Sequence, residues 1–147
     1  RRVRDFAVVA GAQTLDGELA VATDWNPSWA WAAGAMTSTL ADLKVWVPAL
    51  ATGELLSPEL QAERLDTAQL WPDEPDAGYG LGLFDNHGWI GHNGSLPGYQ
   101  TVAVYLPEAE TTLIVMVNTD VETEEANPAA SLMTPITTLL SPEHVYE

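Results

Sequence analysis

Apolar residues at helical spacing predict one clear helix in the first half of the chain. Thr39 with Asp42 three residues later is a capping arrangement, and Gly53 supplies a stop. The apolar residues that recur at helical spacing between these signals are Leu40, Leu43, Trp46, Val47 and Leu50. Their spacing favours a helix with one apolar stripe.

The segments around this helix are shorter. Residues 6–21 mix β-like runs around the Asp16-Gly17 turn signal, and residues 26–31 are typical of a loop with buried aromatic side chains. Ser57-Pro58-Glu59 is the start of a second, short helix, because serine caps it and proline suits the first helical position. We expect that helix to reach about Leu65.

After residue 76 the pattern changes to three extended runs. They cover Tyr79 to Phe84 continuing into Trp89 to His92, then Tyr99 to Leu106, and Thr111 to Asn118. Asp85-Asn86 and residues 107–110 are predicted to be the turns between them. The last run is apolar enough to be a central strand covered on both faces.

A closing helix follows the strands. Asn127-Pro128 opens it, and Pro135 either kinks it or marks its true start. Its apolar residues could lie across the sheet and are Leu132, Met133, Ile136, Leu139 and Leu140. The predicted fold class is therefore α+β, with loop and helices over 1–76, antiparallel strands over 77–120 and a closing helix over 127–141.

Charge and composition exclude several classes of partner. Five Lys and Arg against 21 Asp and Glu give a formal charge of −16, which disfavours nucleic acid and anionic lipid. The chain lacks cysteine, so it has no disulfide, no thiolate nucleophile and no Cys-ligated metal. No apolar run approaches the roughly 18 residues of a membrane span. Because the chain starts with Arg1 and not Met, we expect it to be cut from a longer protein.

The segment His92-Asn93-Gly94-Ser95 carries the candidate chemistry, since it places an imidazole, an amide, a glycine and a hydroxyl at a strand. All Lys and Arg lie within residues 1–64, so proton or anion chemistry in the strand-rich half falls to histidine. Ser-x-x-Lys, Tyr-x-Asn, Ser-x-Asn and Gly-x-Ser-x-Gly nucleophile motifs do not occur in the sequence. The chain thus offers donors for an oxyanion without a serine nucleophile.

Three fragments in order resemble one family. They are Ala33-Gly34-Ala35-Met36-Thr37-Ser38-Thr39-Leu40-Ala41-Asp42-Leu43, then Tyr79-Gly80-Leu81-Gly82, then Gly91-His92-Asn93-Gly94-Ser95-Leu96-Pro97-Gly98-Tyr99. This order is similar to the C-terminal part of the class C β-lactamase and D-alanyl-D-alanine carboxypeptidase family. The resemblance implies a β-lactamase/transpeptidase-like fold: a sheet flanked by helices, beside a helical lobe of which this chain holds a little.

The resemblance also implies roles for four residues. His92 matches the first position of the family's Lys-Thr-Gly or His-x-Gly strand motif, at the proton-transfer network. Asn93 takes the place of the usual threonine on the substrate, and Gly94 lets a substrate backbone approach. Ser95 contributes its backbone N–H to the oxyanion hole, so its hydroxyl is incidental.

The implied parent protein is a serine hydrolase of the penicillin-recognising type that forms an acyl-enzyme. Its substrates would be D-Ala-D-Ala peptides, β-lactams or related small amides and esters, and the sequence does not choose among these. Its partner would be the missing N-terminal part, with the nucleophile, and the family implies export. The alternative is a non-catalytic module that binds peptide or sugar.

Two further interpretations are weaker. His87, His92 and Asp85 could be zinc ligands, but their spacing matches no zinc motif, so we expect no metal and no cofactor. The six tryptophans could form a sugar platform. Trp46 on the helix stripe and the cluster Trp25, Trp29 and Trp31 instead favour core packing and cleft lining.

Overall fold

The computed structural model describes residues 11–13, 18–70, 72, 75–121 and 127–147. Its strands are β1 Gly11–Gln13, β2 Leu19–Val21, β3 Ala68–Gln69, β4 Ala77–Tyr79, β5 Phe84–Asn86, β6 Trp89–Leu96, β7 Tyr99–Leu106 and β8 Thr111–Val117. Its α-helices are α1 Trp31–Gly34, α2 Leu40–Thr52, α3 Pro58–Leu65 and α4 Met133–Leu140. Short 3₁₀ turns cover Pro27–Ala30, Pro107–Ala109 and Ala130–Leu132.

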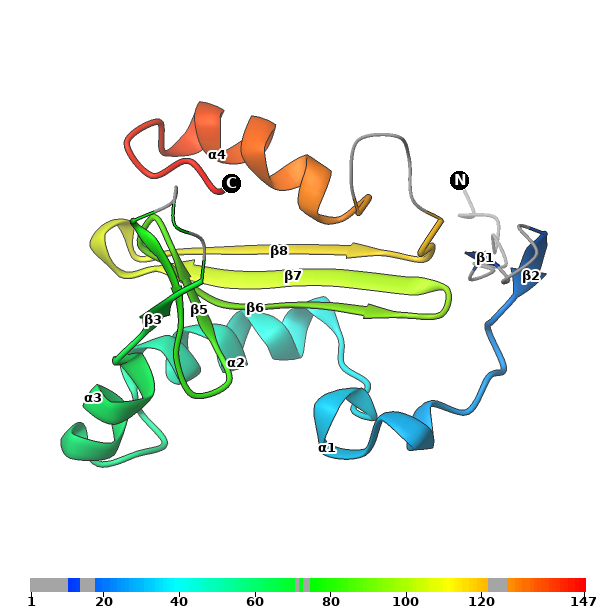
Figure 1. Ribbon diagram of the computed structural model, residues 1–147, viewed down its shortest axis with the longest axis horizontal. Coiled ribbons are helices and arrows are strands. Elements are labelled where there is room, and N and C mark those ends of the chain that lie inside the picture. The colour runs from blue at the N-terminus through cyan, green and yellow to red at the C-terminus, as the bar shows by residue number, and fades with distance from the viewer. Residues whose placement is uncertain (1–10, 14–17, 71, 73–74, 122–126) are drawn as a thin grey trace, which may run out of the picture.

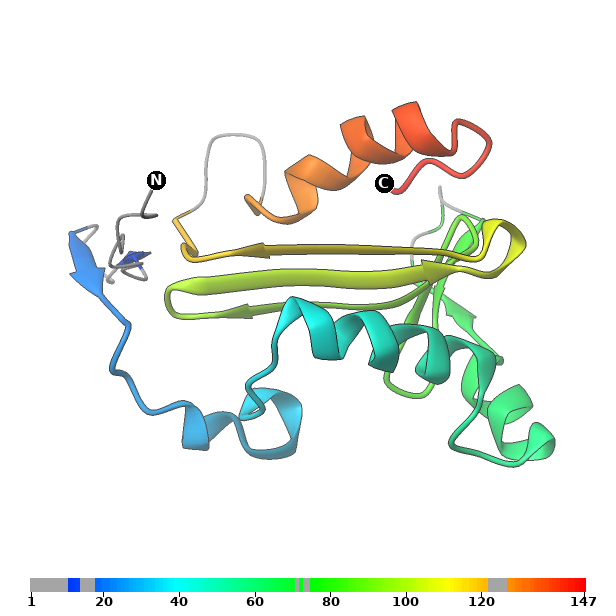
Figure 2. The same cartoon turned by 180° about the vertical axis from the view of Figure 1, so that it is seen from behind.

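A six-stranded antiparallel sheet with the order β3-β4-β5-β6-β7-β8 forms the centre. Figure 1 shows α4 on one face of the sheet and α2 on the other, and Figure 2 shows the same three layers from behind. The β1–β2 hairpin pairs separately. The architecture is α+β, as predicted.

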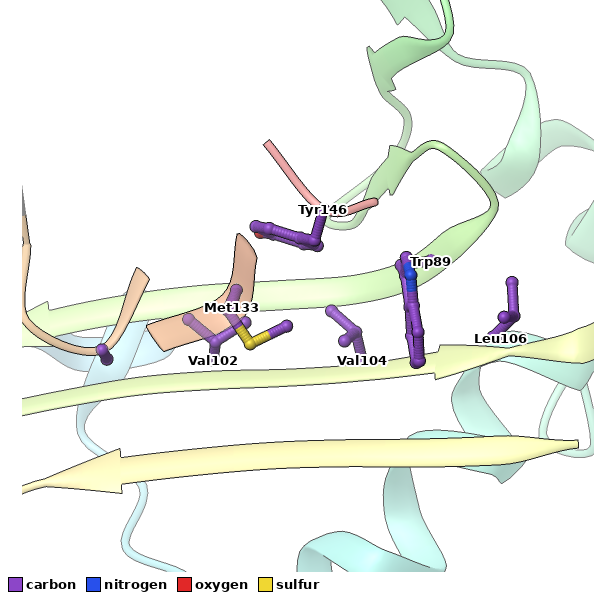
Figure 3. Packing of buried hydrophobic residues seen from close by; sticks show 7 residues of the cluster. Trp89, Val102, Val104, Leu106, Met133 and Tyr146 are labelled. Atoms are coloured by element: carbon purple, nitrogen blue, oxygen red, sulfur yellow. The ribbon is translucent and has the colours of Figure 1, made fainter. Parts of the chain in front are cut away.

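The larger core cluster lies between the sheet and α4. Its buried residues are Trp89, Val102, Val104, Leu106, Ala129, Met133 and Tyr146, several of which Figure 3 shows. Along β7 every second side chain is buried, and these inward residues form the wall on which Met133 packs. A smaller cluster on the opposite face joins Ala51 of α2 to Leu83 and Ile90.

Both predicted helices of the first half are confirmed, with their caps. The Thr39 hydroxyl accepts the backbone N–H of Asp42 at the start of α2, and Gly53 ends that helix with φ +82°. The Ser57 hydroxyl accepts the N–H of Leu60 at the start of α3. At this end, a hydrogen bond from its own backbone amide and one from Ser57 lower the pKa of Glu59.

The first extended run is wrong in its boundaries. A turn at Gly80–Leu83 separates β4 from β5, with the N–H of Gly80 donating to the carbonyl of Leu83 and Gly82 at φ +78°. Asp85 and Asn86 lie in β5, and the turn falls at His87-Gly88, where both residues have positive φ. This is the conformation of a two-residue type I′ hairpin, a turn for which His-Gly is a weaker sequence signal than Asn-Gly or Asp-Gly.

β8 is covered on both faces, as predicted, but its position in the sheet differs from the prediction. Among the described strands β8 pairs with β7 alone and stands at the end of the six-strand order, so it is not a central strand there. Most of its side chains are half-buried, and Met116 is exposed. Its apolar run therefore reflects packing against α2 and the α4 cluster on the two faces, and not enclosure between strands.

The prediction of core packing is wrong for four tryptophans of the described structure, whereas cleft lining stays a prediction. Trp29 and Trp31 are 68% and 83% exposed, and Trp25 and Trp46 are also exposed. Residues 27–34 form a 3₁₀ turn and the short α1 instead of a loop over the core. Sequence pattern identified these side chains as apolar but could not tell what covers them.

The closing helix begins later than predicted. Asn127 caps a turn by accepting the backbone N–H groups of Ala129 and Ala130 on its side-chain oxygen, and α4 starts only at Met133. Pro135 sits in the first turn of α4, so it marks the start and does not kink the helix. Met133 is buried and Ile136 half-buried, whereas Leu132, Leu139 and Leu140 are exposed.

Two predictions cannot be compared with the structure. Residues 6–10 and the Asp16-Gly17 turn lie outside the described residues, although the flanking β1 and β2 do pair as a hairpin.

Within the described part of the chain, no helix is long and apolar enough to cross a membrane.

Candidate functional site

The candidate residues lie on the half of β6 that only one strand pairs. β7 pairs with β6 from Ile90 to Leu96, whereas β5 pairs with it only from Trp89 to Gly91. From His92 to Leu96 no strand of the described chain pairs with the second edge of β6. The predicted motif therefore occupies an open backbone edge.

Hairpin geometry determines which backbone groups face that edge. Leu96-Pro97-Gly98-Tyr99 is a two-residue hairpin with Gly98 at φ +81°, which fits a type II turn that directs the Leu96 carbonyl to β7. Because backbone groups of an antiparallel strand alternate between its two neighbours, those of Asn93 and Ser95 point away from β7. Ser95 thus presents its N–H at the open edge, as an oxyanion donor must.

The side chains alternate as well. Ile90 belongs to the smaller core cluster, on the α2 side of the sheet, and Trp89 belongs to the larger one, on the α4 side (the α2-side and α4-side clusters). Their packing defines the two faces of β6. By the period of two, the Cα–Cβ bonds of His92 and Asn93 point to opposite sides of β6. Both residues, with Gly94 and Ser95, are exposed. The structure therefore brings the four residues to one edge of β6.

Gly91 and Gly94 have opposite surroundings on the same strand. A Cβ on Gly91 would lie 2.1 Å from the carbonyl oxygen of Ala103, so glycine is required there by close packing. A Cβ on Gly94 would meet no heavy atom within 4 Å. The packing of the described chain therefore does not explain a glycine at position 94, which is consistent with room for a ligand.

The His92 ring is held by hydrogen bonds at both nitrogens. Nε2 lies 2.9 Å from the hydroxyl of Tyr79, and Nδ1 contacts the backbone carbonyl oxygen of Asn93. The ring also packs edge-on to Tyr79 at 5.6 Å between centroids and lies tilted to Phe84 at 5.0 Å. The imidazole is exposed yet fixed in direction, because three neighbouring groups constrain it.

Tyr79 is the site residue that residue-by-residue reasoning missed. It lies on β4, paired with Phe84 of β5, which is itself paired with Gly91 beside His92. Thirteen residues separate Tyr79 from His92, and two turns bring them together. The Tyr-Gly-Leu-Gly fragment was the available signal, but only the register shows which side chain its tyrosine meets.

Other sites are not supported in the described residues. Among them no group of three His, Asp or Glu side chains could hold a metal ion, and Asp85 instead accepts the backbone N–H of Gly88. A shallow hollow at the far end of the α4 face shares no residue with the β6 edge. It is lined by Leu106, Glu108, Ala109, Ser141, Pro142, Glu143 and His144.

Comparison with known proteins gives matches over most of the chain. The Beta-lactamase family profile matches residues 3–136. A D-stereospecific amidohydrolase from a Streptomyces species superposes with a TM-score of 0.70 at 31% identity, covering 76% of this chain and 35% of that one. A D-amino acid amidase from Ochrobactrum anthropi SV3, solved with L-phenylalanine amide, gives 0.69 at 26% identity, covering 90% and 40%. This chain spans well under half the length of either protein.

Proposed function

From the premise that this chain belongs to the Beta-lactamase family, we propose that its β6 edge is one half of the active site of a serine hydrolase that cleaves small amides. The fold is β-lactamase/transpeptidase-like, and the structures it matches include amidases for D-amino acid substrates. The observation that carries the proposal is the unpaired stretch of β6 from His92 to Leu96, with the Ser95 N–H directed outward.

The edge supplies orientation and charge stabilisation. A substrate carbonyl that accepts the Ser95 N–H would be polarised, and the same donor would stabilise the oxyanion after attack. The open space at Gly94 admits the substrate backbone alongside β6. His92 adds an imidazole that can hold or accept a proton near the leaving group.

The nucleophile has to come from another part of the protein, because the chain contains no Ser-x-x-Lys sequence. A serine hydroxyl would lose its proton to a neighbouring base and bond to the amide carbon. The amine would leave with a proton, and water would then release the acid from the ester. On this proposal the chain alone forms no acyl-enzyme, since donors without a nucleophile provide no covalent step.

Charge favours amides over substrates that carry a carboxylate. The strand region contributes no Lys or Arg, and the chain carries a formal charge of −16. A field of this sign attracts a substrate with a free amine and repels a terminal carboxylate. Amides of D-amino acids carry the amine without the carboxylate, whereas D-Ala-D-Ala peptides end in one. We therefore place amino acid amides ahead of peptides and β-lactams.

The deciding experiment measures hydrolysis by the complete protein that contains this chain. Release of ammonia from D-phenylalanine amide should exceed release from the L-amide and cleavage of a D-Ala-D-Ala peptide by at least about tenfold, the effect of roughly 1.4 kcal/mol of differential binding. A labelled penicillin separately reports whether a nucleophilic serine is present. No hydrolysis and no labelling would favour the alternative, a module that only binds peptide or sugar.

A further inference from the structure

The contact between Tyr79 and His92 joins two distant strands at the candidate site. The phenol oxygen lies 2.9 Å from Nε2, a normal hydrogen-bond distance, and the two rings meet edge to face at 81°. Tyr79 pairs with Phe84, and Phe84 pairs with Gly91, so the register brings the phenol to the part of β6 that carries His92. The contact exists only when all three strands are in register.

The two hydrogen-bond partners of the His92 ring differ, because the Asn93 carbonyl can only accept whereas the Tyr79 hydroxyl can donate or accept. A backbone carbonyl only accepts, so the contact of Nδ1 with the Asn93 oxygen requires a hydrogen on Nδ1. In the neutral ring Nε2 then has no hydrogen and accepts from the Tyr79 hydroxyl. If the ring gains a proton, Nε2 donates and the same hydroxyl accepts. A phenol is thus compatible with both charge states and both neutral tautomers of the ring, and the Asn93 carbonyl is the partner that selects the tautomer.

We propose that Tyr79 is a positioning residue for His92: its hydroxyl holds the imidazole in the orientation in which Nδ1 meets the Asn93 carbonyl, and that carbonyl then keeps the hydrogen on Nδ1. The inference rests on the proposed function, in which His92 takes part in proton transfer. In a histidine ring, the hydrogen bond made by one nitrogen determines whether the other nitrogen carries the hydrogen. Here the local carbonyl fixes the hydrogen on Nδ1 and Tyr79 fixes the ring's direction.

Phe84 contributes packing without a hydrogen bond to the ring. Its ring meets Tyr79 at 4.8 Å and 72°, and His92 at 5.0 Å and 47°. Phe84 therefore offers a matched comparison: Phe84→Leu removes an aromatic neighbour but leaves the phenol, whereas Tyr79→Phe removes the hydroxyl but leaves the aromatic packing. The first variant tests stacking and the second tests the hydrogen bond.

The main experiment reads the imidazole nitrogens directly. In the complete protein with ¹⁵N-labelled histidine, the neutral His92 ring should show a hydrogen on Nδ1 and a bare Nε2, assigned by loss of its signals in His92→Gln. Tyr79→Phe should free the ring to rotate away from the Asn93 carbonyl, so these signals should move toward the averaged positions of a ring that exchanges tautomers, and Phe84→Leu should not have this effect. A native ring with its hydrogen on Nε2, or an unchanged spectrum in Tyr79→Phe, would overturn the proposal.

Kinetics provide a second measurement. Tyr79→Phe should lower kcat/KM for the amide roughly 10- to 100-fold, the usual effect of losing a group that orients a functional histidine. The thermal unfolding midpoint of Tyr79→Phe should be close to that of Phe84→Leu. Equal activities of the two variants would contradict the role of the hydroxyl. If the protein proves inactive on every amide, the proposed function fails, yet the nitrogen spectrum still decides the tautomer.

Discussion

The indole N–H of Trp89 donates to the backbone carbonyl of His144 at 2.7 Å, joining the start of β6 to the segment that follows α4. Trp89 is fully buried in the α4-side cluster (Figure 3). Nearby, Nδ1 of His144 contacts the carbonyl of His87, and its Nε2 pairs with Glu108 at 3.1 Å. The last residues of the chain thus close the end of the sheet at which β6 begins.

Trp89→Phe should destabilise the fold by about 2–4 kcal/mol, because it removes ring volume from a packed core and leaves a buried carbonyl without its donor. Chemical denaturation of the complete protein measures the change. Trp31→Phe is the matched control, since Trp31 is exposed, and it should stay within about 0.5 kcal/mol. Similar losses in both variants would show that Trp89 has no special role.

The two glycines of β6 should respond differently to the same substitution. Gly91→Ala places a methyl group 2.1 Å from the Ala103 carbonyl oxygen, so we expect loss of several degrees or more in the unfolding midpoint. Gly94→Ala meets no neighbour and should fold normally. If substrate lies along this edge, its KM should nevertheless rise. Normal folding of Gly91→Ala would contradict the strand register described here.

Two substitutions at position 95 test the Ser95 hydroxyl and the Ser95 backbone N–H separately. Ser95→Ala keeps the N–H and should retain hydrolysis within about twofold. Ser95→Pro removes an N–H that β7 does not use, so the strand tolerates it better than a ladder position would. Loss of an oxyanion donor should lower kcat about 100- to 1,000-fold. Steady-state kinetics and circular dichroism measure both properties, and an inactive Ser95→Ala would move the function to the hydroxyl.

Tyr146 predicts sensitivity to alkali. Burial raises the pKa of its phenol above the ordinary value near 10. Below that value both folded and unfolded states keep the proton, so this group adds no pH dependence. As pH rises further the unfolded chain releases the proton first, and the free energy of unfolding falls. Tyr146→Phe should flatten this fall in denaturation curves at pH 9–11 (about one unit either side of the ordinary value), whereas Tyr99→Phe, at an exposed position, should not.

Local signals explain which elements could be predicted. The caps at Thr39 and Ser57 and the stop at Gly53 are short-range chemistry, and each stands where the sequence indicated. The open edge could be predicted in part, because the His92 motif lay on a strand. That β6 extends to Leu96, and that its second edge is unpaired there, follows from the short β5 and not from the motif itself.

Longer-range features were not available from sequence. The separation of β4 from β5 depends on the turn at Gly80–Leu83, and the Tyr79–His92 contact depends on that separation. Exposure of Trp29 and Trp31 depends on what lies over them, which no local pattern encodes. The position of β8 at the sheet end likewise depends on strand order and not on its apolar composition.

The two-residue turn at Pro97-Gly98 sets the register between β6 and β7 at the site. Since side chains alternate, adding one residue to this loop and shifting the ladder by one would exchange the sides taken by His92 and Asn93. The imidazole would then turn away from Tyr79, and Ser95 would direct its N–H into the ladder. If this edge takes part in hydrolysis, as proposed, we therefore expect an insertion at Pro97-Gly98 to lower activity more than an insertion at residues 107–110.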